Sequence, residues 1–514
     1  MKSLVPQYDS LSDVYPDLSA QDDTALSVRR RFLKLTNTFQ QEFGHKPSFV
    51  ARSPGRVNII GEHIDYSMYS VLPAGIGSDV LIAVRVLPKA QDSLFSIKMA
   101  NGDMQKYPRR EITIGQSGLV EIDSDQHSWT NYILAGLRGS LPYLRGRLGS
   151  SFTPNDMEIL VDGNIPPGGG QSSSAAFICA SILSVMGANN YSISRDDLLE
   201  LAVVSERAVG VFSGGMDQAA SIFAERDCLI HCNFFPKFST ERISFPDSGC
   251  VFLIAQSFVT SEKAVTAPVH YNLRVLECTL AAVVLAKICD INLEKDESPL
   301  GYCLRNLQEQ IMKKSGQASD SPETQLSSMI DIVNARLTMT SYTREEIAYL
   351  LQIPTEELDR RYISQVNVRA EFFKLRQRAL HVLEEARRVD RFRNTLTNCG
   401  DLNRERLLYL GELMNQTQAS CKTLYECSCP EIDQICSISR SSGAYGARLT
   451  GAGWGGGTVH IVPQDKVSAV INALRTEYYL KKVPGLSQEK LRTAISIFKP
   501  GQGSSLIGIS ALES

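Results

Sequence analysis

The sequence predicts a protein of the α+β class. Its first half alternates short, β-branched runs with helical patterns, and glycine-rich turns separate them. Its second half opens with the strand-like run CVFLIAQS, continues with amphipathic patterns typical of helices, and closes on a strand, a glycine loop and a strand. The 514 residues are enough for two to four domains of ordinary size.

In the first half, a polar leader precedes a helix predicted over 26–43. Strands are predicted at 49–51, 57–60 and 80–86, because apolar and β-branched residues gather there between glycines and prolines. A further strand, MEILVDG, runs into a glycine loop, and an apolar helix follows from Ser172. A helix is then predicted at 196–209, and the segment GVFSGGMDQAAS interrupts the pattern.

In the second half, helices are predicted over 272–288, from Thr343 onward, and over 371–389. Thr343 and Glu346 have the spacing of a capping box. The segment 315–322, SGQASDSP, predicts a flexible surface loop. Five apolar residues on one face of the last helix predict ordinary core packing: Phe372, Leu375, Ala379, Val382 and Ala386.

Composition and charge narrow the classes of function. A net charge of -3 and a pI near 6.2 provide no basic field, so we expect no direct binding to nucleic acid. The N-terminus lacks the pattern of a signal peptide, and no run of about 18 apolar residues occurs, so we expect a cytoplasmic protein that does not enter the membrane. The twelve cysteines should mostly be reduced thiols, and the spacing of Cys421, Cys427, Cys429 and Cys436 favours packing over zinc binding.

Three consecutive glycines precede three serines in the segment VDGNIPPGGGQSSSAAF. The glycines allow backbone N–H groups to approach a ligand closely, and the helix that follows presents unpaired N–H groups to an anion. The serine hydroxyls can bond phosphate or Mg2+. The pattern indicates an anion-binding loop, and a plain loop with a helix cap is the alternative.

Two common nucleotide-binding motifs do not apply. The stretch from Gly451 to Gly456 fits G-x-G-x-x-G, but the run TVHIV after it predicts a strand where a dinucleotide site needs a helix. We therefore expect a tight glycine turn beside a ligand or another stretch of backbone. The chain contains no Gly-Lys pair, which excludes a P-loop, so phosphate must be held in another way.

Charged residues are concentrated in two other segments. SPGRVNIIGEHIDY places Arg56, Glu62, His63 and Asp65 within ten residues between apolar runs. Carboxylates accept hydrogen bonds from sugar hydroxyls and a guanidinium neutralises phosphate charge, so this segment predicts a polyol site. A solvated turn with a surface salt bridge is one alternative, and a metal site is another.

The second segment, SERAVGVFSGGMDQAAS, contains two carboxylates. Glu206 is expected on a helix, and Asp217 follows a Gly-Gly pair that frees the backbone to aim its side chain. As an alternative, Asp217 caps the helix that follows it.

Taken together, these stretches resemble the galactokinases. SPGRVNIIGEHIDY is similar to their signature. GNIPPGGGQSSSAAF and LTGAGWGGGTVHIV are similar to the phosphate loop and third motif of the wider superfamily of galactokinase, homoserine kinase, mevalonate kinase and phosphomevalonate kinase. GGMDQAAS, TAPVHYNLRVLE and TQASCKTLYECSCPEID resemble the fungal branch in particular. The likeness runs from about residue 45 to residue 500.

The resemblance implies a fold and a site. It implies two α+β domains with the active site in the cleft between them: 1–240 with the sugar signature and phosphate loop, and 241–514 with the third glycine motif. It implies a galactose site of Arg56, Glu62, His63, Asp65, Gly214, Asp217 and Tyr271. It implies an ATP site of Gly168, Gly169, Gly170, Ser172, Ser173, Ser174, Ala175, Trp129, Tyr132, Ser261 and Lys263.

In the reaction so implied, the γ-phosphoryl group of ATP moves to the anomeric hydroxyl of galactose. Asp217 acts as the base, Arg56 lies beside the transferred phosphoryl group, and Ser174 and Glu206 hold Mg2+. Gln171 stands where the family usually has leucine, and its effect on the loop is left open.

Two alternatives to a galactokinase follow from the same resemblance. An N-acetylgalactosamine kinase would need room for the acetamido group, which the sequence does not reveal. A non-catalytic galactose sensor would bind sugar and ATP and engage a transcriptional repressor. Such relatives lack a Ser-Ala pair in the phosphate loop, whereas the run from Ser172 to Ala176 is complete here, which favours the enzyme without excluding a double role.

Overall fold

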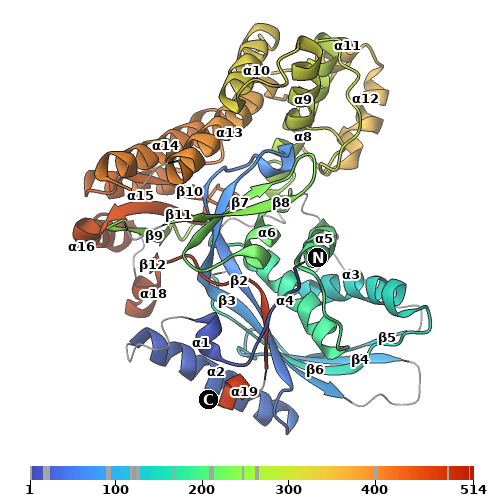
Figure 1. Cartoon of the computed structure of the whole chain (residues 1–514), viewed down its shortest axis with the longest axis vertical. Helices are drawn as coiled ribbons and strands as arrows, with labels where there is room; N and C mark the ends of the chain where they lie inside the picture. The colour runs from blue at the N-terminus through green and yellow to red at the C-terminus, as the bar shows by residue number, and fades with distance from the viewer. Residues whose placement is uncertain are drawn as a thin grey trace.

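The computed structural model describes residues 3–15, 23–87, 94–115, 120, 122, 128–166, 168–207, 213–245, 248–260, 266–398, 402–482, 485–508 and 510–513. Its helices and strands confirm the α+β class. The strands form a seven-stranded sheet, a four-stranded sheet and a two-stranded ribbon. In Figure 1 the large sheet lies in the lower half and the long helices of the second half of the chain lie above it.

The large sheet has the order β1-β13-β2-β3-β6-β4-β5. Its strands are β1 (Gln7–Tyr8), β2 (Phe49–Ile60), β3 (Leu72–Leu87), β4 (Phe95–Asn101), β5 (Arg110–Ile114), β6 (Asp156–Gly163) and β13 (Ser505–Gly508). The pairs β1/β13 and β4/β6 are parallel and the others antiparallel. Strand β13 returns from the C-terminus to this N-terminal sheet, and the division of the chain near residue 240 stays a prediction.

Helices cover both faces of this sheet. Side chains alternate along each strand, so neighbouring residues of one strand belong to different cores. In β3, Leu81 and Ala83 belong to a core with helix α2 (Asp23–Phe43), whereas Ile82 and Val84 belong to the main core with helix α4 (Ser173–Ala188). Helices α3 (Thr130–Leu148), α5 (Arg195–Arg207) and α6 (Met216–Phe223) lie on the α4 side. Helix α4 is apolar almost all round and buried, as the sequence suggested.

The four-stranded antiparallel sheet has the order β10-β11-β9-β12. Its strands are β9 (Cys250–Gln256), β10 (Gly446–Thr450), β11 (Gly457–Pro463) and β12 (Ile495–Phe498). The ribbon pairs β7 (Cys228–Asn233) with β8 (Ser239–Ser244). The glycine turn at 451–456 therefore joins two antiparallel strands, which confirms that no dinucleotide-binding helix follows it.

Helices dominate the second half. The longer ones are α8 (Tyr271–Ile288), α9 (Leu304–Ser315), α10 (Pro322–Arg336), α11 (Arg344–Leu351), α12 (Thr355–Arg361), α13 (Leu375–Thr397), α14 (Arg404–Thr423), α15 (Pro430–Ser441) and α16 (Val467–Ala473). Short helical pieces in this half are α17 (Leu480–Lys482), α18 (Gln488–Thr493) and α19 (Ser510–Glu513), and another, α1 (Leu11–Val14), lies near the N-terminus. Thr343 and Glu346 form the predicted capping box.

Two local predictions differ from the structure. The strands expected at 49–51 and 57–60 are one strand, β2, because a bulge between Pro54 and Arg56 lets the chain continue past the proline. The helix expected from residue 371 begins at Leu375, so Phe372 lies before it and is exposed rather than part of the core face.

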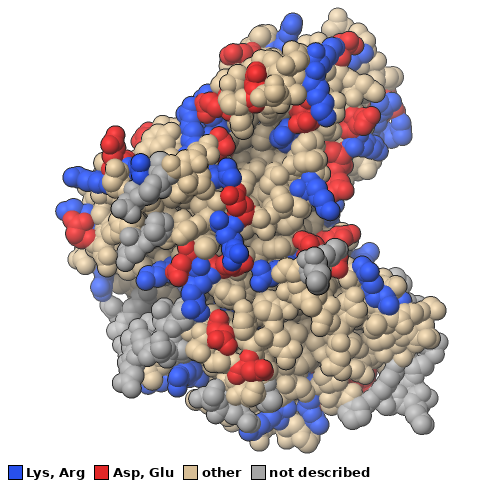
Figure 2. Space-filling model, viewed as in Figure 1, with Lys and Arg blue, Asp and Glu red and all other residues tan. Residues whose placement is uncertain are grey.

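The surface in Figure 2 mixes acidic and basic side chains and is hollowed at the right, between the upper helices and the lower part.

Among the helices that the structure describes, none combines the length and the apolar character that crossing a bilayer requires.

Candidate active site

The structure brings Arg56 and Asp217 into direct contact although 161 residues separate them. Arg56 lies on β2, and Asp217 lies in the first turn of α6. The guanidinium donates from Nε and Nη2 to Asp217 Oδ1 at 2.8 and 2.5 Å, and from Nη1 to the carbonyl oxygen of Gly170 at 2.6 Å. One buried cation therefore joins the carboxylate to the glycine loop. The cap of α6 is Gly215, so the helix-cap interpretation of Asp217 is wrong.

A second carboxylate, Asp65, lies beside this pair. It follows the turn after β2 and accepts a hydrogen bond from the backbone N–H of Met216 at 3.3 Å. Gly214 makes this approach possible, since a Cβ atom there would lie 2.4 Å from the backbone nitrogen of Tyr66. Burial and the nearby charge of Asp217 raise the pKa of Asp65 to about 6.

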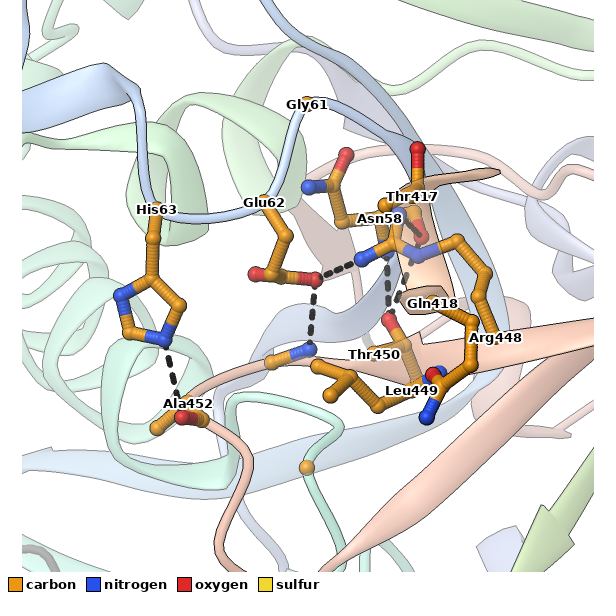
Figure 3. A network of polar contacts seen from close by, with 12 residues as sticks. Asn58, Gly61, Glu62, His63, Thr417, Gln418, Arg448, Leu449, Thr450 and Ala452 are labelled. Atoms are coloured by element: carbon orange, nitrogen blue, oxygen red, sulfur yellow. Dashed lines mark hydrogen bonds and ion pairs between the residues drawn. The ribbon is translucent and has the colours of Figure 1, made fainter. Parts of the chain in front are cut away.

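Glu62 is held by Arg448 and by the third glycine motif, which follows Arg448 (Figure 3). Its Oε2 accepts hydrogen bonds from Arg448 Nη2 and from the backbone N–H of Gly451, the latter at 3.0 Å. The ring of His63 turns toward Ala452, and because a carbonyl can only accept, His63 Nε2 is the donor over 2.9 Å. The first half of the chain thus meets the β10–β11 turn through two consecutive side chains.

Aromatic rings surround His63. Its ring centroid lies 5.4 Å from that of Tyr271, 5.0 Å from Tyr425 and 5.7 Å from Trp454. Tyr271 is the first residue of α8 and is buried. Arg56, Glu62, His63 and Asp65 are themselves all 4% exposed or less, so the alternative of a solvated surface turn is wrong.

The glycine loop packs directly against the third motif. A Cβ atom on Gly170 would lie 2.5 Å from the carbonyl oxygen of Thr450, and one on Gly451 would lie 2.7 Å from that of Gly170. Gly168, with φ 69°, and Gly170, with φ 74°, have the left-handed backbone that glycine adopts without strain. The expected tight turn beside another stretch of backbone is therefore confirmed.

Helix α4 begins at this loop without a conventional cap. Ser172 is its N-cap residue, adopts φ 56°, and makes no side-chain capping bond. Within the described part of the chain, its buried hydroxyl has no hydrogen-bond partner. The N–H groups of the first turn, from Ser173 to Ala175, are of the kind that bind anions. Gln171 is buried, and its carbonyl accepts from the backbone N–H of Arg56 at 3.2 Å.

Ser174 and Glu206, the two predicted Mg2+ ligands, are in contact. The hydroxyl of Ser174 donates to Glu206 Oε1 at 3.1 Å. The other carboxylate oxygen accepts from Ser213 Oγ at 2.8 Å and Gln218 Nε2 at 2.6 Å. Glu206 is 2% exposed. A buried carboxylate with a hydroxyl next to the anion loop provides the oxygen ligands that Mg2+ prefers, so these residues fit the ion.

Trp129 and Tyr132 lie at the start of α3. Tyr132 stacks on Phe177 of α4, with ring centroids 5.4 Å apart. Among the residues described, the buried Trp129 Nε1 has no hydrogen-bond partner. Ser261 and Lys263 lie outside the described residues.

Sequence reasoning missed the partners that hold these side chains. Arg448 precedes the third motif and is fully buried against Glu62. Tyr425 lies within the cysteine-rich segment, where Cys421, Cys427 and Cys436 are buried and Cys429 is half-buried. An arginine inside an apolar strand pattern was the signal for Arg448, because a buried charge requires a partner.

Three family models match the chain: the galactokinase galactose-binding signature at 37–86, the GHMP kinases N terminal domain at 131–225 and the GHMP kinases C terminal at 400–480. The galactokinase of Dictyostelium discoideum is 38% identical over 94% of this chain and 93% of its own length. That of Saccharomyces cerevisiae is 37% identical over 98% of both chains. The structure of Lactococcus lactis galactokinase complexed with galactose aligns with a TM-score of 0.64 at 24% identity, covering 92% of this chain and 98% of that one, and so shows a shared fold.

Proposed function

Because this chain belongs to the galactokinase family, we propose that it transfers the γ-phosphoryl group of ATP to the anomeric hydroxyl of galactose. The observation that carries this function is the contact of Arg56 with both Asp217 and Gly170. A phosphoryl transfer needs one group that accepts the hydroxyl proton and another that places positive charge beside the phosphate. Asp217 and Arg56 are groups of these two kinds, and they are in contact.

Asp217 is the proposed base. Its carboxylate accepts the proton of the sugar hydroxyl as the sugar oxygen bonds to the γ-phosphorus and the bond from that phosphorus to ADP, the leaving group, breaks. Such a role is worth typically about 10²- to 10⁴-fold in rate. The guanidinium of Arg56 pairs with this carboxylate and, through its bond to Gly170, lies at the edge of the phosphate loop. The same cation is therefore placed to stabilise the charge that develops on the phosphoryl group.

The other predicted residues have supporting roles in this proposal. Glu62, His63, Asp65, Gly214 and Tyr271 form the sugar site with Arg56 and Asp217, because buried polar groups and aromatic rings suit the polar and apolar faces of a hexose. The N-terminus of α4 and the glycine loop receive the ATP phosphates, and Trp129 and Tyr132 flank the adenine. Ser261 and Lys263 are proposed near the nucleotide from the sequence alone.

Ser174 and Glu206 are the proposed Mg2+ ligands, and phosphate oxygens and water would complete the coordination shell. When bound, the ion would neutralise part of the phosphate charge. Gln218 and Ser213 donate hydrogen bonds to the Glu206 carboxylate, so this carboxylate is already oriented before the ion binds.

A coupled assay of ATP consumption across galactose, N-acetylgalactosamine, glucose and mevalonate tests the function. We expect turnover on galactose with a higher kcat/KM than on N-acetylgalactosamine, and background rates with glucose and mevalonate. Turnover on mevalonate alone would overturn the proposed function. A preference for N-acetylgalactosamine would correct the substrate while leaving the chemistry in place.

A further inference from the structure

The turn that carries the predicted sugar residues has an unusual backbone. Strand β2 ends at Ile60, and the chain then passes through Gly61 with φ 105° and His63 with φ 61°. Left-handed backbone is unfavourable for a residue with a side chain, and it persists only where the surroundings impose it. The turn therefore depends on contacts from elsewhere in the chain.

Helix α13 supplies these contacts from more than 300 residues away. Glu385 Oε1 accepts hydrogen bonds from the backbone N–H of Gly61 at 2.8 Å and of Glu62 at 3.1 Å. One helical turn earlier, His381 Nε2 lies 3.0 Å from the carbonyl oxygen of Glu62 and must be the donor there. Two side chains on one face of α13 thus bind three of the four backbone polar groups of Gly61 and Glu62. Figure 3 shows the course of this turn from Gly61 to His63.

Further hydrogen bonds hold the side chains of Glu385 and His381 in place. Glu385 Oε2 accepts from Arg388 Nε and from Thr417 Oγ1, each at 2.8 Å. His381 Nδ1 lies 2.8 Å from Ser420 Oγ, which donates to it because Nε2 holds the ring proton. Thr417 and Ser420 belong to α14, so two packed helices form one rigid support.

The negative charge of Glu385 strengthens its hydrogen bonds to the turn. Burial opposes ionisation of Glu385, but Arg388 and Arg448 hold its pKa at about 2, so the two backbone N–H groups face a carboxylate. Burial lowers the pKa of His381 to about 3, which keeps the ring neutral and its tautomer fixed. Both side chains are fully buried. Hydrogen bonds to a charged acceptor are the stronger kind.

We propose that Glu385 and His381 are positioning residues for sugar binding, which hold the turn Gly61–His63 so that Glu62 and His63 face the sugar. They act through the turn and are not catalytic residues. The inference rests on the proposed function, since it takes galactose as the ligand of the site. It assigns control over galactose affinity to α13, in the second half of the chain. ATP binding stays with the glycine loop, α4 and the aromatic residues at the start of α3.

The test compares Glu385→Gln and Glu385→Ala with the matched control Glu384→Gln. Glu384 directly precedes Glu385 on α13, and its carboxylate pairs with Arg387 instead of binding the turn. Galactose Kd is measured by calorimetry without ATP, and KM for each substrate by the coupled assay. Exchange of the amides in 58–66 with deuterium is followed on the same preparations.

We expect Glu385→Gln to raise galactose Kd and KM about three- to tenfold, because it keeps an acceptor but loses the charge. Glu385→Ala should raise both by tenfold or more, or fail to fold, in which case His381→Leu replaces it with a rise of about threefold or more. Amide exchange in 58–66 should accelerate, while KM for ATP stays within twofold and Glu384→Gln matches the parent.

Two results would overturn the inference: a Glu385→Gln variant whose galactose Kd and amide exchange match the parent, or an equal rise in KM for both substrates. The proposed function is tested separately by the parent protein. A parent that neither binds nor phosphorylates galactose would refute the function, whereas amide exchange in 58–66 would still report whether α13 holds the turn.

Discussion

Replacing Asp65 with asparagine should make the protein more stable while weakening its site. Asp65 is buried beside Asp217, and the amide of asparagine can still accept the hydrogen bond from Met216. The substitution removes a charge that burial and Asp217 disfavour. Carboxylates retained at such positions commonly serve function at the expense of stability.

The magnitude follows from the pKa of Asp65. Its value rises from an ordinary 3.8 to about 6, so the native state binds the proton more tightly than the unfolded chain does. The free energy of unfolding therefore falls as pH rises from about 4 to about 6, and at 1.36 kcal/mol per pKa unit the loss is about 3 kcal/mol above that window. An unfolding entropy of about 1.1 kcal/mol/K for 514 residues converts this into a rise in Tm of about 3 °C for the asparagine variant.

Differential scanning fluorimetry at pH 7.5 and pH 5 measures this effect, with Glu200→Gln on the exposed face of α5 as the control. We expect the asparagine variant to show the full rise in Tm at pH 7.5 and about half of that rise at pH 5, because Asp65 of the parent is mostly protonated in the native state at pH 5. Galactose affinity should fall in the same variant. A Tm below that of the parent at pH 7.5, or a gain independent of pH, would refute the reasoning from burial and like charge.

Further predictions concern the nucleotide side of the site. Trp129→Ala should raise KM for ATP severalfold and leave KM for galactose unchanged, because it removes stacking area from the adenine; equal effects in a steady-state assay would indicate a structural role. Deleting Ser174 and Ala175 rotates the start of α4 by about 200° relative to the rest of the helix. Phosphorylation should fall to background while calorimetry still detects galactose binding, and turnover within a few-fold of the parent would show that this loop does not hold the phosphates.

The sequence was most informative where function depends on neighbouring residues. The glycine loop and the capping box are local patterns, and the structure places each on the expected element. The charged segment, expected between two strands, begins within β2 and continues into the turn that follows it. The contact of Arg56 with Asp217 followed from the family resemblance. Prediction failed at the bulge of β2, where Pro54 suggested a break, because a bulged antiparallel pair tolerates proline.

The supporting residues could not be predicted in the same way. Arg448 and Glu385 lie more than 300 residues from the turn they bind, and only the packing of α13 and β10 against β2 brings them there. On α13 the apolar residues Leu375, Ala379 and Val382 do form the expected core face. The buried His381 and Glu385 among them look like surface residues in a helical pattern, because their partners are backbone groups of another segment.

The role of Asp217 as base is tested most directly by the Asp217→Asn variant, assayed for turnover and for galactose binding on one preparation. Asparagine preserves the shape of the side chain and removes its ability to accept the hydroxyl proton. We predict that kcat falls roughly 10²-fold or more while the variant folds and still binds galactose in calorimetry. Turnover close to that of the parent, in a variant that binds galactose normally, would contradict the assignment of Asp217 as the base.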